Sequence, residues 1–262
     1  MSRPVIALLT DFGLHDHYVG TMKGVLLGIC PDAALVDISH DIPPQDVAAG
    51  AMELAAAYRY FPAGTVFLCV VDPGVGSSRR PLAAETDGYR FVAPDNGLLS
   101  LVLGREASMV ELTNAAYRLP FVSKTFEGRD RFAPAAAWLA NGTTLGDLGP
   151  PVHTIARLSL PSPRISSASI DGEVVRVDRF GNLITNIDAR ALMSLGALAN
   201  VDATIGSDVP LPLVTTYADV DEGALCAVVG SSGQLEVACR GGSAADRLGA
   251  GRGAAVHLAR RA

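Results

Sequence analysis

The stretch Leu8-Leu9-Thr10-Asp11-Phe12-Gly13 decides the fold, because an apolar run stops there at a carboxylate and a glycine-bearing turn follows. The same pattern recurs in Val70-Val71-Asp72-Pro73-Gly74-Val75-Gly76 and in Val92-Ala93-Pro94-Asp95-Asn96-Gly97. In an open α/β sheet, ligands bind outside the carboxyl ends of the strands. The three turns therefore predict one ligand-binding edge with three carboxylates. Such an edge suits a ligand with hydroxyl groups or positive charge, and it does not suit a phosphate.

Around these turns, the first half of the chain alternates between strand-like and helix-like segments. Strands are predicted at 5–10, 34–39, 65–71 and 89–93, and helices at 19–30, 46–60, 98–103 and 131–140. The pattern predicts an α/β domain with a mostly parallel sheet flanked by helices. Asp16 and Asp130 precede two of the helices and are expected to cap them.

The character of the sequence changes near residue 150. Residues 158–167 are rich in proline and serine and are predicted to link a domain at 1–157 to a second domain at 168–262. Short strands are expected at 170–178, 183–187, 200–205, 225–230, 235–239 and 254–258, with a weak helical pattern at 188–195. This arrangement predicts an all-β, barrel-like or sandwich domain.

Composition limits the classes of function. The 262 residues are 49% hydrophobic with a net charge of −6, so a large core is expected and non-specific nucleic-acid binding is not. No signal peptide is evident, and no apolar run approaches the ~20 residues that cross a bilayer. The four cysteines form no Cys-x-x-Cys pair and are expected to be buried and reduced. We expect a cytoplasmic protein with no nucleic-acid or membrane partner.

Two loops of the first domain carry candidate functional groups. In the loop from Asp72 to Arg79, a proline and two glycines indicate a tightly turned backbone that brings this carboxylate and guanidinium face to face. The loop lacks the Gly-Lys-Ser/Thr of a phosphate loop. A purely structural ion pair is the alternative. In Thr125-Phe126-Glu127-Gly128-Arg129-Asp130, Glu127 is either an exposed loop residue or part of a site, and Arg129 is expected to pair with an acidic residue.

Two polar turns mark the second domain. Asp178-Arg179-Phe180-Gly181-Asn182 either forms a simple hairpin or supplies charge, stacking and an amide that can read an adenine edge. Gly230-Ser231-Ser232-Gly233 offers backbone amides and hydroxyls that can hold a carboxylate. Among the five histidines only His15 and His17 are close in sequence, and no cysteine joins them, so no metal site is predicted.

Together these motifs resemble the S-adenosyl-L-methionine (SAM) hydrolases that form adenosine, also called SAM hydroxide adenosyltransferases, which are related to fluorinase and chlorinase. The resemblance covers nearly the whole chain. It rests on LLTDFGLHDHYVGTMKGVL (8–26), ICPDAALVDISHDIPPQDV (29–47), FPAGTVFLCVVDPGVG (61–76), APDNGLLS (93–100), GRDRFAP (128–134), DRFGNLITNI (178–187) and GSSGQLEVA (230–238).

The resemblance implies hydrolysis of SAM to adenosine and L-methionine by attack of water or hydroxide on the ribose 5′ carbon. SAM is then the substrate, and no cofactor is implied. It also implies a homotrimer whose sites lie between the N-terminal domain of one subunit and the C-terminal domain of its neighbour. The roles that it implies are Asp11 for the ribose hydroxyls, Asp16 near the methionine, Asp178 for its ammonium, Ser231 for its carboxylate, Asn182 for the adenine, and Phe180 and Tyr217 as walls.

The resemblance assigns the catalytic role to Asp72, Arg79 and the residue at position 127. The family pattern reads Phe-His-Gly-Arg-Asp, whereas this chain has Glu127 in place of the histidine. A carboxylate can accept a proton from water as histidine does. Its negative charge stabilises a sulfonium substrate more than a transition state in which the positive charge is fading. We therefore expect slower turnover than in a relative with histidine.

Two alternatives to hydrolysis are open. In the first, the change from histidine to Glu127 abolishes catalysis, and the protein only binds an adenosyl ligand. A SAM-dependent halogenase is the weaker alternative, because fluorinase has a threonine at the place of Val75 and a tyrosine at the place of Asp72. The carboxylates of Asp72 and Glu127 would repel a halide in a dry pocket.

Overall fold

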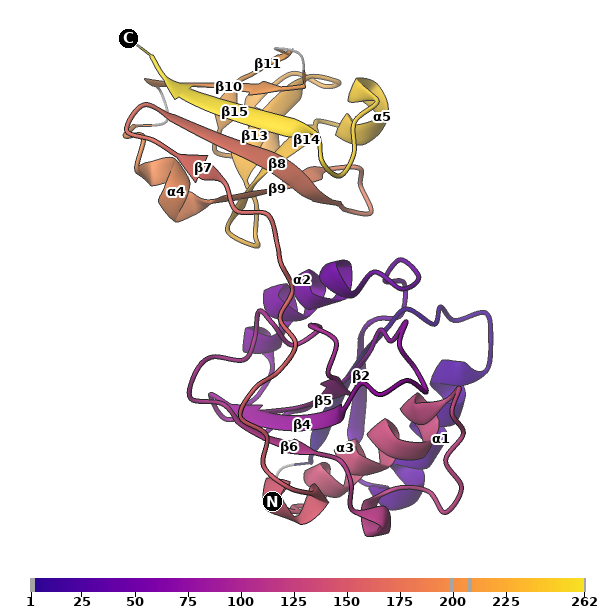
Figure 1. Cartoon of the computed structure of the whole chain (residues 1–262). Helices are drawn as coiled ribbons and strands as arrows, with labels where there is room; N and C mark the ends of the chain where they lie inside the picture. Colours follow the sequence, from indigo (N-terminus) through magenta and orange to yellow (C-terminus); the bar gives the residue numbers. More distant parts are fainter. Residues whose placement is uncertain (1–2, 198–199, 207–208, 262) are drawn as a thin grey trace. The chain divides into compact units, whose positions relative to one another are not determined.

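The computed structural model describes residues 3–197, 200–206 and 209–261. The chain divides into two compact units, unit 1 at residues 1–159 and unit 2 at residues 160–262, each with its own sheet (Figure 1). Within the described residues, the search for a helix with the length and apolar character of a membrane span finds none.

Unit 1 contains a six-stranded sheet in the order β2-β1-β3-β5-β4-β6. Its strands are β1 (Val5–Thr10), β2 (Ala34–Ser39), β3 (Val66–Val70), β4 (Pro81–Thr86), β5 (Tyr89–Pro94) and β6 (Ser108–Glu111). β2, β1, β3 and β5 are parallel, as predicted, but β4 is antiparallel to both β5 and β6, so the sheet is mixed. The β4–β5 hairpin turns at Asp87-Gly88, where both residues have positive φ, as a tight hairpin requires.

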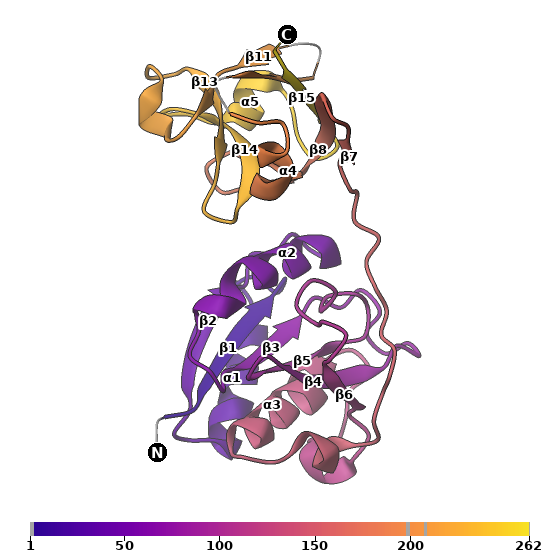
Figure 2. The ribbon, with the colours of Figure 1, turned by 90° about the vertical axis from the view of Figure 1, so that its left-hand side faces the viewer.

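Helices cover both faces of this sheet (Figure 2). α1 (Tyr18–Ile29) and α3 (Ala133–Ala140) pack with the alternate β3 residues Val66, Leu68 and Val70, whereas α2 (Val47–Ala57) packs with Phe67 and Cys69. Successive side chains of a strand point to opposite faces, and every residue of β3 is buried. The continuous apolar run of this strand follows from its cover on both sides.

Three local predictions in unit 1 are wrong. Asp16 does not cap α1, which begins after His17 without a side-chain cap. Asp130 caps nothing, because Gly128–Phe132 forms a π-helical turn (η3) that runs directly into α3. Residues 98–102 form turns instead of the helix expected at 98–103, with i to i+3 hydrogen bonds from the Ser100 and Val102 N–H groups to the Gly97 and Leu99 carbonyls. Asp46, by contrast, caps α2 by accepting from the Ala49 N–H at 2.9 Å.

Unit 2 is built on nine strands in the path β11-β10-β15-β8-β9-β14-β13-β12, with β7 paired to β8. The strands are β7 (Arg164–Ile165), β8 (Ser169–Val177), β9 (Leu183–Asp188), β10 (Val201–Ile205), β11 (Val209–Leu211), β12 (Leu213–Val214), β13 (Leu225–Val229), β14 (Gln234–Cys239) and β15 (Ala255–Arg260). β8 pairs with β15 along its first half and with β9 along its second. The sheet therefore curls, and its barrel-like form is nearly closed.

Short helices complete both units. Unit 2 contains the short helices α4 (Ala189–Met193) and α5 (Ala244–Leu248) beside its sheet. It is therefore mainly, but not entirely, the all-β domain that was predicted. The short 3-10 helices are η1 (Tyr58–Tyr60), η2 (Ala115–Tyr117), η4 (Leu145–Leu148) and η6 (Tyr217–Asp219). All four cysteines are buried and unbridged, as predicted.

Candidate functional site

Three loops of unit 1 meet at the carboxyl ends of its parallel strands. Gly76 has φ +76°, and a Cβ there would lie 2.4 Å from the Lys124 carbonyl oxygen, so the loop after β3 packs directly on the backbone that precedes η3. Phe12, from the loop after β1, contacts Phe126 with ring centroids 6.1 Å apart. The contacts bring the loops that carry Asp11, Asp72 and Glu127 to one edge of the sheet.

At this edge, Asp72, Arg79 and Glu127 form one ion-pair cluster. Arg79 Nε donates to Asp72 Oδ1 at 2.8 Å, and Arg79 Nη2 donates to Asp72 Oδ2 and to Glu127 Oε2. The side chains of Asp72, Arg79 and Glu127 are only 5%, 9% and 11% exposed. The sequence prediction that Asp72 and Arg79 face each other is correct, and Glu127 joins them rather than lying exposed in its loop.

The cluster keeps Arg79 charged. Burial acts most strongly on this guanidinium and lowers its pKa, but the hydrogen bonds and charges of Asp72 and Glu127 together outweigh burial and raise the pKa above its ordinary value. The guanidinium also lies over the ring of Phe132, 5.3 Å from its centroid. Arg79 is therefore a fixed cation whose orientation is set on three sides.

Asp11 lies on the loop after β1, whose Phe12 contacts Phe126 next to Glu127. Its Oδ2 accepts from the Gln45 N–H at 2.8 Å, and Gln45 has φ +66°, a conformation that costs energy for a residue other than glycine. The hydrogen bond from the Gln45 N–H therefore holds one oxygen of the Asp11 carboxylate in place. The side chain is only partly buried, so its other oxygen can accept from a ligand hydroxyl.

Two other acidic residues do not join the cluster. Asp95 pairs with Arg80, whose Nη2 is 2.6 Å from Oδ2, and accepts from the Ala156 N–H at 2.8 Å through Oδ1. Its side chain is only 7% exposed and both oxygens are paired within unit 1, which corrects the expectation that it faces a ligand. Asp16 lies in the loop before α1 with its side chain 63% exposed, and within unit 1 it meets no group of the ion-pair cluster.

In unit 2, Asp178 organises the turn between β8 and β9. Its Oδ1 accepts from the N–H groups of Phe180 and Asn182 at 2.9 and 2.8 Å, and its Oδ2 accepts from Asn182 Nδ2 at 2.9 Å. Asn182 is buried and held by this bond, whereas Phe180 is 76% exposed. The hairpin expected as the structural alternative is therefore present, and it presents an exposed aromatic ring beside an oriented amide.

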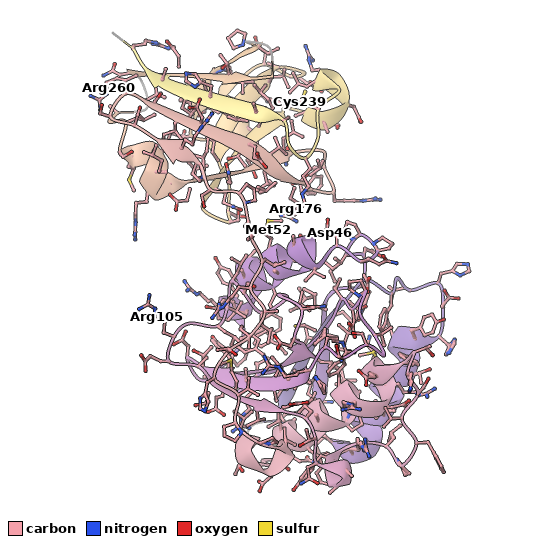
Figure 3. The ribbon with its side chains drawn as sticks, in the orientation of Figure 1. Asp46, Met52, Arg105, Arg176, Cys239 and Arg260 are labelled. Atoms are coloured by element: carbon pink, nitrogen blue, oxygen red, sulfur yellow. The ribbon has the colours of Figure 1, made fainter. Side chains whose placement is uncertain are left out.

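A second polar group in unit 2 surrounds the buried Glu236 on β14. The Tyr217 hydroxyl donates to Glu236 Oε1, and a Cβ at Gly230 would lie 2.4 Å from Glu236 Oε2. The turn that carries the exposed Ser231 thus rests on the Glu236 carboxylate. Arg176 of β8, labelled in Figure 3, interacts electrostatically with this carboxylate. Glu236, which no sequence motif marked, therefore contacts both the predicted residue Tyr217 and the turn that carries the predicted residue Ser231.

Burial shifts the proton affinities of this group. It raises the pKa of Glu236 above its ordinary value, and the charge of Asp178 adds to this rise, while the Tyr217 hydrogen bond and Arg176 oppose it. Burial likewise raises the pKa of Tyr217, assisted by Glu236. Burial lowers the pKa of Arg176, against the charges of Asp178 and Glu236. The folded protein therefore holds a proton on Glu236 more tightly than the unfolded chain does.

Glu236→Gln is expected to change how stability depends on pH. Because the pKa of Glu236 is higher in the folded protein, the stability of the native protein falls as pH rises from the unfolded value near 4.5 through the folded value. Glutamine keeps an acceptor for Tyr217 and does not ionise. The melting temperature of the variant minus that of the native protein should therefore grow from pH 4 to pH 7. A constant difference would contradict this expectation.

No group of three or more histidine, cysteine, aspartate or glutamate side chains is arranged to hold a metal ion within the described residues. The functional side chains instead form carboxylate–guanidinium and carboxylate–amide contacts.

The comparisons with known proteins match both units. Residues 6–149 match the family model for the SAM hydroxide adenosyltransferase N-terminal domain, and residues 172–257 match that for the C-terminal domain. The chain belongs to the SAM hydroxide adenosyltransferase family. It is 43% identical to the (R)-S-adenosyl-L-methionine hydrolase of Salinispora tropica over 94% of both chains, and 42% identical to that of Thermus thermophilus over 98% and 99%.

A solved structure has the same fold. The crystal structure of an uncharacterized conserved protein from Thermotoga maritima superposes with a TM-score of 0.91 at 35% identity, covering 97% of this chain and 100% of the other. Proteins named fluorinase match at 30 to 32% identity. The chain is therefore more similar in sequence to the (R)-S-adenosyl-L-methionine hydrolases than to these fluorinases.

Two charged residues of this family member lie outside the motifs that were singled out in the sequence. Glu236 stands between Leu235 and Val237 in a strand whose residues from 235 to 239 are all buried, and a lone carboxylate in such a strand signals a functional or paired group. Arg131 follows Glu127 by four residues, a spacing at which opposite charges meet on helical turns. Arg131 Nη2 lies 3.3 Å from Glu127 Oε1.

Proposed function

We propose that this protein hydrolyses S-adenosyl-L-methionine to adenosine and L-methionine. The observation that carries the proposal is the buried cluster of Asp72, Arg79 and Glu127 at the ligand-binding edge of unit 1. The cluster supplies a fixed cation and a carboxylate side by side, which are the groups needed to bind and deprotonate a water molecule. The family membership of the chain and the printed names of its relatives support the same reaction.

In the proposed mechanism, the water oxygen attacks the ribose 5′ carbon from the side opposite the sulfur. Arg79 uses Nε and Nη2 for the two carboxylates, and its Nη1 is available to bind the water oxygen. This guanidinium favours the hydroxide-like form that develops during attack, while Glu127 accepts the proton that the water loses. Holding the water within roughly 3–3.5 Å of the carbon supplies much of the rate enhancement.

The leaving group needs no acid. As the new C–O bond forms, the C–S bond breaks and its electron pair remains on sulfur, which changes from a sulfonium to the neutral thioether of methionine. The proton taken by Glu127 passes on to solvent before the next turnover. Two neighbouring carboxylates also attract the sulfonium cation, and the charge of Arg79 weakens this attraction.

The other predicted residues are proposed to bind the substrate. Asp11 accepts from the ribose hydroxyls through the oxygen that Gln45 does not occupy. Asn182, oriented by Asp178, reads the adenine, and Phe180 and Tyr217 form apolar walls. Asp178 retains acceptor capacity for the methionine ammonium beyond its hairpin bonds. Ser231 binds the methionine carboxylate, and Asp16 is proposed to lie near the methionine end.

The protein should release equimolar adenosine and methionine when it is incubated with SAM. In water enriched with ¹⁸O, the adenosine should carry one ¹⁸O atom at its 5′ oxygen, because that oxygen comes from solvent. Mass spectrometry of the nucleoside measures this directly. Separate incubations with SAM enriched in either sulfonium epimer should favour the (R) form named in the relatives.

The same assay separates the alternatives. SAM binding without any adenosine would indicate a non-catalytic adenosyl-binding protein and would overturn the proposal. A halogenated nucleoside that forms only with added chloride would indicate a halogenase. Val75 and the paired carboxylates disfavour a bound halide, since the carboxylates repel it.

We also propose a homotrimer in which each site draws on two protomers, an expectation that sedimentation analysis of the purified protein can check. The water-activating groups belong to unit 1, whereas the amide and aromatic groups proposed for the adenosyl and methionyl parts belong to unit 2. Phe180 is 76% exposed in unit 2, and aromatic side chains are enriched at protein–protein interfaces. The unbridged cysteines support the proposal of a cytoplasmic location.

A further inference from the structure

Glu127 is held between two guanidinium groups. Arg79 Nη2 donates to its Oε2, and Arg131 Nη2 lies 3.3 Å from its Oε1. Arg131 is itself anchored, because its Nη1 donates to the Leu112 carbonyl oxygen at 3.3 Å. Each carboxylate oxygen therefore has its own arginine, and the plane of the carboxylate is fixed relative to Arg79.

The second arginine also balances the charge of the cluster. Asp72 and Glu127 contribute two negative charges, and Arg79 and Arg131 contribute two positive ones. Without Arg131, this buried group would carry one excess negative charge. Such an excess would hold a sulfonium ion more tightly in the ground state than in a transition state where its charge is fading.

The surroundings of Arg131 do not suit a purely structural role. Within the described residues, its Nε is buried and has no hydrogen-bond partner, and an unpaired buried donor lowers stability. Arg131 also lies in the π turn Gly128–Phe132, a type of turn found frequently at functional sites. The turn brings Arg131 into contact with Glu127, but it leaves the Nε donor of Arg131 without a hydrogen-bond partner.

We propose that Arg131 is a positioning residue for the hydrolysis, acting through Glu127 by balancing its charge and fixing its orientation toward Arg79. The inference rests on the proposed function for its kinetic consequence. The ion pair itself predicts that the effect of changing Arg131 depends on whether residue 127 is charged.

A double-mutant cycle tests this dependence. In the native background, Arg131→Met should lower kcat by about tenfold or more without raising KM, since the excess negative charge strengthens rather than weakens binding of the sulfonium ground state. In a Glu127→Gln background, where no charge needs balancing, the same change should alter kcat by less than about threefold. Steady-state release of adenosine over a range of SAM concentrations gives kcat and KM for all four proteins.

Two further variants keep the test decisive. Arg131→Lys preserves the charge and should stay within about threefold of the native kcat, and it carries the test if the methionine variant does not fold. Arg129→Met is the matched control, because Arg129 lies in the same turn but pairs with Asp130. Its effect should be the same in both backgrounds.

The outcomes are distinguishable. Equal losses from Arg131→Met in both backgrounds, no loss in either, or a tenfold loss in the lysine variant would overturn the role of Arg131. A native protein that binds SAM but releases no adenosine would overturn the proposed function instead, and the kinetic role of Arg131 with it. Melting temperatures of the four proteins would still report whether Arg131 and Glu127 are coupled, and additive changes would refute the ion-pair coupling.

Discussion

Arg79→Gln is expected to reduce kcat by about 10²–10³-fold, as the loss of one preorganised donor to a developing charge does in other enzymes. The change also leaves Asp72 and Glu127 as adjacent buried carboxylates without their shared cation. Removing one partner of a buried pair typically lowers stability by about 3–5 kcal/mol. Adenosine release and the denaturant midpoint should therefore fall together.

Arg79→Lys separates the two effects. Lysine keeps the positive charge and so preserves more of the stability, but its single ammonium cannot form the forked contact to both carboxylates. Its kcat should therefore remain depressed even where the protein is fully folded. Arg80→Gln is the matched control, because Arg80 is adjacent in sequence and pairs with Asp95 outside the cluster. A kcat in Arg79→Lys equal to the native value would remove Arg79 from the mechanism.

Asp11→Asn is expected to raise KM by about 10–100-fold with little change in kcat, since hydrogen bonds to a charged group contribute about 1.5–3 kcal/mol each. Asparagine can still accept from the Gln45 N–H, so the loop conformation is retained. Its amide nitrogen cannot accept from a ribose hydroxyl. An interaction equally strong in the ground and transition states affects KM rather than kcat.

Steady-state kinetics on SAM measures this change, and the exposed Asp41 provides a control because its conversion to asparagine removes a charge from a neighbouring loop. Asp41→Asn should leave both constants near their native values. A fall in kcat without a change in KM for Asp11→Asn would place Asp11 in the chemical step and contradict its assignment to substrate binding.

Much of the parallel sheet could be predicted, because its strands are continuous apolar runs that end in acidic turns. The structure places β1 and β2 on the predicted residues. The pairing of Asp72 with Arg79 could also be predicted, since a proline and two glycines force the short loop between them to fold back. Local sequence was sufficient wherever both partners belonged to one loop.

The errors at Asp95 and Glu127 share a physical cause. In each case the arginine that pairs with the carboxylate belongs to, or directly precedes, an element that was not predicted. Arg80 precedes β4, whose antiparallel pairing with β5 sets Pro81 opposite Pro94. Without β4 in the prediction, the occupation of Asp95 by Arg80 could not be foreseen. Arg131 was overlooked for a similar reason, because the helix was expected to begin at residue 131, whereas the π turn begins at Gly128, directly after Glu127.

The π turn at Gly128–Phe132 also has an implication for chain length. Its Ala133 N–H reaches back five residues to the Gly128 carbonyl, one residue more than in an α-helix. Because each α-helical residue rotates the chain by about 100°, deleting one residue here would swing the segment before it around the axis and carry Glu127 away from Arg79, which belongs to another loop. Exposed loops commonly tolerate the deletion of one residue. A deletion in this turn should instead break the contact between Glu127 and Arg79.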